Sequence, residues 1–208
     1  MMLKRISAIL LFCLLAVLPS RAKVPDSSIG ARRIFDKAYA QVFGAQGSSF
    51  SYDVNISGLY KTHGSIWMKG KKARFQETKV DCYNDGVTAY MIYKKKKLIE
   101  IHPANSDKKD KYSGKFKFEL DDFDYSMASS AEGLLLTLRQ RKDAKGTIKE
   151  VKALIDAKTY APKLLKVKVY FLWATVNIRN FMSGNISDQT FVFPRSRYGS
   201  AYKYVDKR

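Results

Sequence analysis

The sequence has 208 residues, with 38 Lys and Arg against 19 Asp and Glu, which gives a formal net charge of +19. Hydrophobic residues make up 46 % of it and aromatic residues 13 %. This composition excludes intrinsic disorder for most of the chain, and the length suits one domain. The one long apolar run, Ile6 to Leu18, has 13 residues. A helix that spans a bilayer needs about 20.

Residues 1–22 have the organisation of a secretory signal peptide, with Lys4 and Arg5 before the apolar run. We expect cleavage near Ala22 and export to the periplasm. Residues 23–208 then form a single domain with 35 basic and 19 acidic residues, a net charge of +16. The positive charge therefore belongs to the folded domain.

The first predicted element of that domain is an amphipathic helix over Ser27 to Phe43, which Gly44 can end. Its apolar stripe consists of Ala31, Ile34, Phe35, Ala38 and Val42. From Phe50 to Ile56 apolar residues recur at every second position, as in a strand with one solvent-exposed face.

The rest of the chain reads as short strands separated by turn residues. We expect strands near Lys61 to Lys69, Ala73 to Thr78, Lys79 to Tyr83, Val87 to Tyr93, Lys97 to His102, Lys115 to Leu120, Phe123 to Met127, Gly133 to Arg141, Thr147 to Asp156, Lys163 to Phe171 and Leu172 to Phe181. Short connections imply antiparallel neighbours, and so long a sheet must curl or close. The predicted fold class is mainly β with a helical lid (α+β): a curled, unclosed antiparallel β-barrel of about eleven strands, with the N-terminal helix in its mouth.

Residues for catalysis are scarce. The two histidines, His63 and His102, lie about forty residues apart, and none of the common nucleophile, metal or nucleotide motifs occurs. Cys82 is the one cysteine after the signal peptide, and we expect it to be a small apolar residue packed in the core. We therefore expect neither an enzyme nor a cofactor.

Two charged features have alternative interpretations. The acidic cluster of Glu119, Asp121, Asp122 and Asp124 could hold calcium, but its spacing matches no EF-hand, and a solvated turn is the alternative. The lysine run Lys94 to Lys97 lies at a turn. In an exported protein such cations favour anionic lipid, an acidic partner or plain solubility over nucleic acid.

Apolar and aromatic side chains exceed what a simple core requires, with 13 Tyr and 12 Phe in the sequence. The strands would place many of them on the concave face of the sheet. Either they and the helix fill this space completely, or part of it is a cavity for an apolar ligand.

Several segments resemble the LolA-like lipoprotein carriers, in the variant of Bacteroides-type bacteria. Gly64 to Gln76 combines a glycine-led strand, a basic turn and an Arg beside an aromatic residue, and Tyr83 to Tyr93 has the pattern D-G-x-T-x-aromatic-x-x-Tyr. Ala153 to Val169 is similar to the late strands of the family, and Asn180 to Pro194 with Tyr204 to Arg208 is similar to its tail.

The resemblance implies an unclosed barrel that carries lipoprotein acyl chains, or another lipid, in an apolar hollow towards the outer membrane. An inner-membrane donor and an outer-membrane acceptor would be its protein partners. We expect a monomer that performs no covalent chemistry and binds no nucleic acid and no metal.

Specific residues follow from this interpretation. The cavity would be lined by Phe50, Tyr52, Val54, Ile66, Met68, Met91 and Leu136, and the lid face would be Ile34, Phe35 and Val42. The basic turn of the family commonly carries Arg-Pro, and here Lys69 stands at that turn. We expect Lys69 and Arg74 at the rim.

Another class of function stays open. A module of the same fold without cargo could bind an acidic partner or a membrane surface through its lysines. An enzyme would require His63 or Cys82 to be essential.

Overall fold

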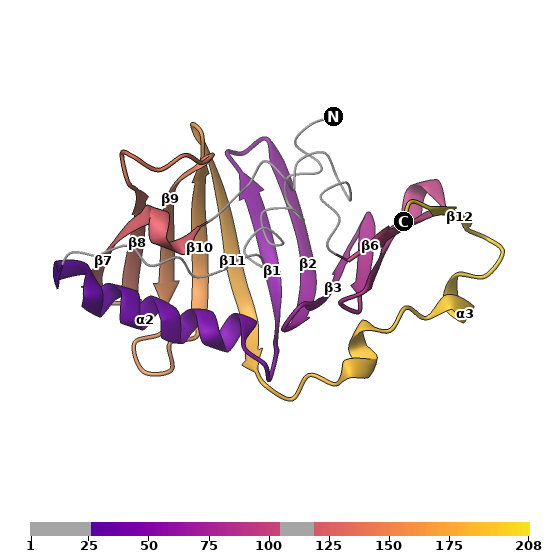
Figure 1. The fold of residues 1–208 in the computed structure, drawn as a ribbon, viewed down its shortest axis with the longest axis horizontal. Helices are drawn as coiled ribbons and strands as arrows, with labels where there is room; N and C mark the ends of the chain where they lie inside the picture. The colour runs from indigo at the N-terminus through magenta and orange to yellow at the C-terminus, as the bar shows by residue number, and fades with distance from the viewer. Residues whose placement is uncertain (1–25, 105–118) are drawn as a thin grey trace.

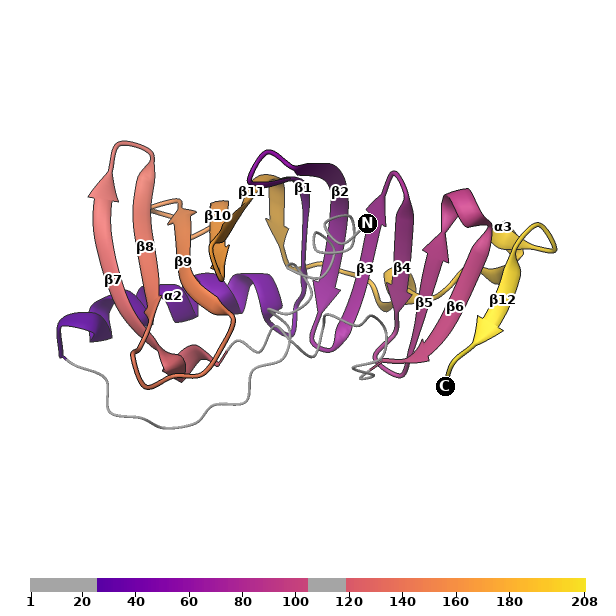
Figure 2. The same ribbon diagram turned by 90° about the horizontal axis from the view of Figure 1, so that it is seen from above.

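One long curled sheet forms most of the molecule. The computed structural model describes residues 26–104 and 119–208, so the signal peptide expected at residues 1–22 lies outside the described residues. The described strands form a 12-stranded sheet in the order β12-β6-β5-β4-β3-β2-β1-β11-β10-β9-β8-β7. The sheet is unclosed, and the helix α2 (Asp26–Phe43) lies across the half that contains β7 to β11 (Figure 1, Figure 2).

The strands are β1 (Ser48–Ile56), β2 (Tyr60–Lys69), β3 (Lys72–Glu77), β4 (Val80–Asn84), β5 (Thr88–Tyr93), β6 (Leu98–Pro103), β7 (Phe123–Ser130), β8 (Gly133–Gln140), β9 (Ile148–Ile155), β10 (Pro162–Val169), β11 (Leu172–Ser183) and β12 (Lys203–Asp206). Short helices lie between some of them: η3 (Lys94–Lys96), η5 (Leu120–Asp122), η6 (Asp188–Phe191) and α3 (Arg195–Tyr198). The fold class predicted from the sequence, an unclosed curled sheet with an N-terminal helix, is confirmed.

One predicted strand lies mostly outside the described residues, and one observed strand was not predicted. The strand expected over Lys115 to Leu120 falls mostly outside the described residues, and Leu120 itself begins η5. The four-residue β12 was not expected, and it pairs with β6 in parallel, with Lys203 opposite Leu98. Because β6, the partner of β12, lies about a hundred residues earlier in the chain, no local sequence pattern predicts this pairing.

The main core lies on the concave face. The register joins Phe50 to Ile66 and Ile66 to Phe75, so these three side chains form a row across β1, β2 and β3. Helix α2 packs its apolar stripe, including buried Phe35 and Ala38, against this face. Full burial of each large side chain contributes about 1.5–3 kcal/mol to folding. Helix α2 therefore packs where its apolar stripe meets the apolar face of the strands.

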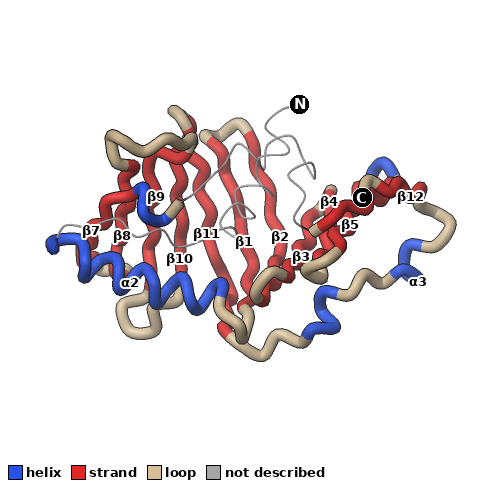
Figure 3. The backbone as a smooth tube through the Cα atoms, viewed as in Figure 1, coloured by secondary structure: helices blue, strands red, loops and turns tan. Residues whose placement is uncertain are grey.

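A second, smaller core lies on the convex face, where the C-terminal segment, residues 187–202, covers β4 to β6 (Figure 3). Phe193 stacks on Tyr90 with ring centroids 4.2 Å apart, and on Tyr198 at 5.3 Å. The segment then leads into β12, which extends the sheet. Among the described residues, no helix is both long and apolar enough to cross a membrane.

Candidate functional site

An apolar cavity of about 80 Å³ lies between α2 and the concave face of the sheet. Helix α2 contributes one wall, and strands β1, β2 and β8 to β11 contribute the other. Its lining residues are Phe35, Ala38, Tyr39, Val42, Phe43, Phe50, Met68, Leu136, Ala153, Ile155, Pro162, Leu164, Leu165 and Ile178. None of these side chains carries a charge, so the cavity suits hydrocarbon and offers no site for an ion.

The structure brings together five of the residues singled out from the sequence. Phe50, Met68 and Leu136 from the sheet and Phe35 and Val42 from the helix line the cavity. The other residues predicted for this site belong to the core around it: Tyr52, Val54 and Ile66 are buried in the same cluster, and Ile34 and Met91 pack against that cluster.

The sequence interpretation missed most of the wall formed by β9 to β11. The register pairs Leu136 with Ala153 and Ala153 with Leu165, so these three side chains form a concave row across β8 to β10. Ile178 lies on the same face of β11, two residues beyond Val176, the partner of Leu165. Periodicity places such residues on one face of a strand. Which strands lie opposite α2 is determined by the sheet order, and β11 pairs with β1 across more than a hundred residues of chain.

The cavity is small. Apolar cavities of about 150 Å³ hold one benzene molecule, and this one, at about 80 Å³, is smaller still. A fatty acyl chain therefore enters only if α2 moves away from the sheet or if side chains repack.

Polar contacts hold α2 on either side of its apolar stripe. Arg32 Nη1 donates to Asp121 Oδ1 at 2.9 Å, and its guanidinium lies 5.0 Å from the ring centroid of Tyr125. Further along the helix, Gln41 Nε2 donates to the carbonyl oxygen of Thr159 at 2.5 Å. The helix thus rests on apolar contacts at its centre and on hydrogen bonds that water can replace near its ends.

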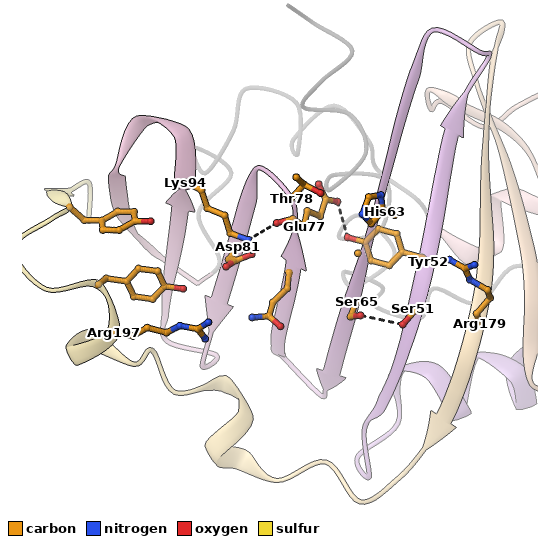
Figure 4. Close-up of a pocket in the computed structure, with 14 residues that line it drawn as sticks. Ser51, Tyr52, His63, Ser65, Glu77, Thr78, Asp81, Lys94, Arg179 and Arg197 are labelled. Carbon is orange, nitrogen blue, oxygen red and sulfur yellow. Dashed lines mark hydrogen bonds and ion pairs between the residues drawn. The ribbon is translucent and has the colours of Figure 1, made fainter.

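A polar cleft of about 710 Å³ occupies the opposite, convex face, between β1 to β4 and the C-terminal segment (Figure 4). It is lined by Ser51, Tyr52, His63, Gly64, Ser65, Gln76, Glu77, Thr78, Asp81, Lys94, Arg179, Arg197, Tyr198 and Tyr202. This cleft could not be predicted from the sequence, since its residues come from distant segments and most of them resemble ordinary solvent-exposed strand positions.

Two buried acids beside the polar cleft have partners: Asp81, on the convex face of the sheet, and Glu77, whose side chain lies on the concave face with that of Tyr52. Lys94 Nζ lies 2.7 Å from Asp81 Oδ1 and donates to the backbone carbonyl of Glu77 at 2.6 Å. The Tyr52 hydroxyl donates to Glu77 Oε1 at 2.7 Å. Burial, with the nearby negative charge of Glu77, raises the pKa of Tyr52 well above its usual range. These contacts link β1, β3, β4 and the β5–β6 turn to one another.

The two residues predicted for the rim lie elsewhere. Lys69 Nζ donates to the carbonyl oxygen of Ile186 at 3.1 Å and lies 3.2 Å from Asp188 Oδ1, which ties β2 to the C-terminal segment. Arg74 is on the convex face, where its guanidinium lies 4.6 Å from the Trp67 ring centroid. Neither residue lines the apolar cavity.

The histidines do not meet. His63 pairs with Asp53 in the sheet and faces the polar cleft, whereas His102 is buried on the concave side of β6, beside Glu100. Three strands separate β2 from β6. Cys82 is buried and free of disulfide bonds.

The acidic cluster forms no metal centre within the described ranges, 26–104 and 119–208. Asp121 instead forms the ion pair with Arg32 of α2.

Comparisons with known proteins bear on the fold. No family model matches the sequence, and no curated protein matches it. Among solved structures, an uncharacterized conserved protein from Thermus thermophilus is similar with a TM-score of 0.56 at 11 % identity, over 86 % of this chain and 99 % of that one. At this identity the likeness shows a shared fold.

Weaker likenesses include a LolA superfamily protein from Nitrosomonas europaea, with a TM-score of 0.38 at 9 % identity over 78 % of this chain and 97 % of that one. The lipoprotein LppX from Mycobacterium tuberculosis has a TM-score of 0.44 at 7 % identity, over 76 % and 97 % of the two chains. One of these two solved structures is described as a LolA superfamily protein, the family that the sequence motifs resemble.

Proposed function

We propose that the chain is a periplasmic carrier that binds the acyl chains of lipoproteins, or of another lipid, between α2 and the concave sheet and delivers them towards the outer membrane. The observation that carries this proposal is the uncharged cavity, closed on one side by a single amphipathic helix. The signal-like N-terminus supports export, and the motif resemblance supports the class of cargo. Binding and release by such a site require no covalent step.

Movement of α2 would open the site. The helix is joined to β1 through a short turn that contains Gly44 and Gly47, and Gly47 has a φ of 77°, a conformation that favours glycine. Water can replace the hydrogen bonds of Arg32 and Gln41 when the helix lifts. The exposed apolar stripe and the concave face would then close on the acyl chain.

The energetics suit reversible transfer. Burial of each methylene group contributes about 0.8 kcal/mol, so ten methylenes would contribute about 8 kcal/mol before the helix displacement is subtracted. That displacement costs part of the apolar contact between α2 and the sheet. A carrier with this balance can take up a chain and release it to an acceptor that binds more tightly.

Within this proposal, the cargo site comprises Phe50, Met68 and Leu136 on the sheet and Phe35 and Val42 on the helix. Tyr52, Val54, Ile66, Ile34 and Met91 form the shell that would repack when cargo enters. Lys69 and Arg74 stay outside the proposed site, because both make their contacts with other parts of the molecule.

Native mass spectrometry of the mature protein, purified from the cell envelope without detergent, tests the proposal. We expect a population whose mass exceeds that of the polypeptide by one lipid or one acylated protein, and which collapses to the bare chain on organic extraction. Only the bare polypeptide, both before and after incubation with fatty acid, would contradict the proposal.

One observation favours a second function. The polar cleft is about 710 Å³, far larger than the apolar cavity of about 80 Å³. A cargo-free module that binds a polar partner through this cleft would show partner binding that Arg197→Ala weakens, while no lipid accompanies the protein.

A further inference from the structure

Three large apolar side chains project into solvent from two neighbouring turns. Leu59, in the β1–β2 turn, is 70 % exposed, and Tyr170 and Phe171, which form the β10–β11 turn, are 59 % and 81 % exposed. We call these three residues the apolar tip. The two turns are adjacent because β1 pairs with β11, and the Ser57 amide donates to the Trp173 carbonyl at 2.9 Å (Figure 1).

The backbone of the β10–β11 turn is unusual for the residues that it contains. Val169 pairs with Leu172, which leaves Tyr170 and Phe171 as a two-residue hairpin turn, and Tyr170 has a φ of 54°. Such turns strongly favour glycine, asparagine or aspartate, and a bulky residue at positive φ is strained. Turn formation therefore does not explain two aromatic residues here, and their exposure shows that core packing does not explain them either.

Cations surround the apolar tip. Lys61 is exposed next to the β1–β2 turn, and Lys168 precedes the β10–β11 turn, with its ammonium 5.9 Å from the Trp173 ring centroid. The Tyr170 amide donates to the Thr147 carbonyl at 2.9 Å. The β8–β9 connection, which carries exposed Lys142, therefore lies alongside.

The same end of the sheet carries more positive charge. In an antiparallel succession, the β1–β2, β3–β4 and β5–β6 turns share one end of the sheet. The β5–β6 turn consists of the four lysines Lys94 to Lys97. Within the part of the chain that the structure describes, Lys94 alone of the four forms an ion pair, with Asp81. The sequence thus places its longest lysine run at the end that bears the apolar tip.

We propose that the apolar tip inserts into the interfacial layer of a bilayer with anionic headgroups, while the lysines at that end contact the headgroups. Aromatic side chains favour the membrane interface, and lysines near a surface of negative potential add attraction. A protein partner fits less well, because a stable protein interface needs roughly 800 Å² on each side. Three side chains on two convex turns suit insertion rather than docking on a broad surface.

This docking site is independent of the cargo site. Helix α2 crosses the opposite, lower part of the sheet in Figure 1, and no residue of the apolar tip lines the apolar cavity. Membrane binding can therefore be measured whether or not the chain carries lipid, and failure of either proposal leaves the other standing.

The test is co-sedimentation of the mature protein with vesicles of phosphatidylethanolamine and phosphatidylglycerol, compared with vesicles of phosphatidylcholine alone. We expect binding to the anionic vesicles that high salt weakens. The double variant Leu59→Ser with Phe171→Ser should bind them roughly tenfold more weakly or worse, since it removes most of the inserted apolar area.

Val87→Ser is the matched control. Val87 is 78 % exposed but lies in the β4–β5 turn at the other end of the sheet, so this variant should bind like the wild type. In addition, Phe171→Trp should add fluorescence that brominated lipid quenches, whereas Val87→Trp should not. Wild-type protein that ignores anionic vesicles, or equal binding by the double variant, overturns the proposal. Loss of a protein partner in the double variant, with no vesicle binding by the wild type, also overturns it.

Discussion

Arg32 connects α2 to η5 and β7, at the far edge of the sheet. Its guanidinium donates to Asp36 on the helix and to Asp121 in η5, both at 2.9 Å, and lies over the ring of Tyr125. The side chains of Arg32 and Asp121 are largely shielded from solvent. Contacts of this kind are stronger than a surface ion pair, and they oppose any lifting of the helix.

Replacing Arg32 by glutamine should therefore loosen α2. We expect the free energy of unfolding to fall by about 2 kcal/mol, because a charged hydrogen bond to a half-buried acid is lost. Uptake of a fluorescent fatty acid, followed by stopped flow, should become faster. Arg33→Gln, at an exposed position of the same helix, is the control and should change neither quantity. Slower uptake in Arg32→Gln would show that the contact does not restrain the helix.

At the scale of elements, the sequence predicts those parts whose partners are near in the chain. The helix over Ser27 to Phe43 agrees with α2 to one residue, because its apolar stripe repeats every three to four positions. The alternation from Phe50 to Ile56 corresponds to β1, whose apolar residues are buried. Local period alone determines such elements.

Elements that depend on distant partners were beyond prediction. β12 is a four-residue strand that forms only because β6 offers a free edge, and the packing of Phe193 on Tyr90 brings the chain back to that edge. Arg74 and Phe75 are neighbours in sequence, but they point to opposite faces of β3. The direction in which the sheet curls decides which face of β3 is concave. Arg74, which we expected at the rim, lies on the other face and therefore points away from the cavity.

The β9–β10 turn is an element whose stability should depend on pH. The Thr159 amide donates to Asp156 Oδ1 at 2.9 Å, Lys163 lies 3.0 Å from the other oxygen, and the Lys158 amide donates to Oδ1 at 3.0 Å. These contacts, the Thr159 amide foremost, hold the pKa of Asp156 well below its usual value. The same turn presents the Thr159 carbonyl to Gln41 of α2.

A depressed pKa in the folded state stabilises the protein above the ordinary pKa of aspartate and loses this effect as pH falls below it. Asp156→Asn should therefore lower the melting temperature at neutral pH. The difference from wild type should shrink as pH falls through 3.8, the ordinary value. Thermal unfolding of both proteins across this range measures it. A difference that stays constant with pH would mean that the charge of Asp156 does not support the turn.

At the scale of the whole molecule, the curled sheet separates two environments. Its concave face, covered by α2, holds the uncharged cavity, and its convex face holds the polar cleft and the C-terminal segment. Apolar side chains supply both the core and the cavity wall, and the lysine run Lys94 to Lys97 lies at the β5–β6 turn. In the proposed carrier, cargo and membrane would thus contact different parts of one sheet.

In the proposed carrier, acyl chains occupy the space between α2 and the concave sheet. Titration of the mature protein with a fluorescent fatty acid tests it most directly, in the wild type and in Ala38→Phe, which fills the cavity from the helix side. Ala40→Phe, exposed on the same helix, is the matched control, and Ala153→Leu fills the cavity from the sheet if Ala38→Phe does not fold.

We predict saturable one-to-one binding by the wild type and by Ala40→Phe. The cavity-filling variant should bind roughly tenfold more weakly or worse, because excluding even two methylenes forfeits about 1.6 kcal/mol. No saturable binding by the wild type, or equal affinity in the filled variant, would contradict the proposed carrier site.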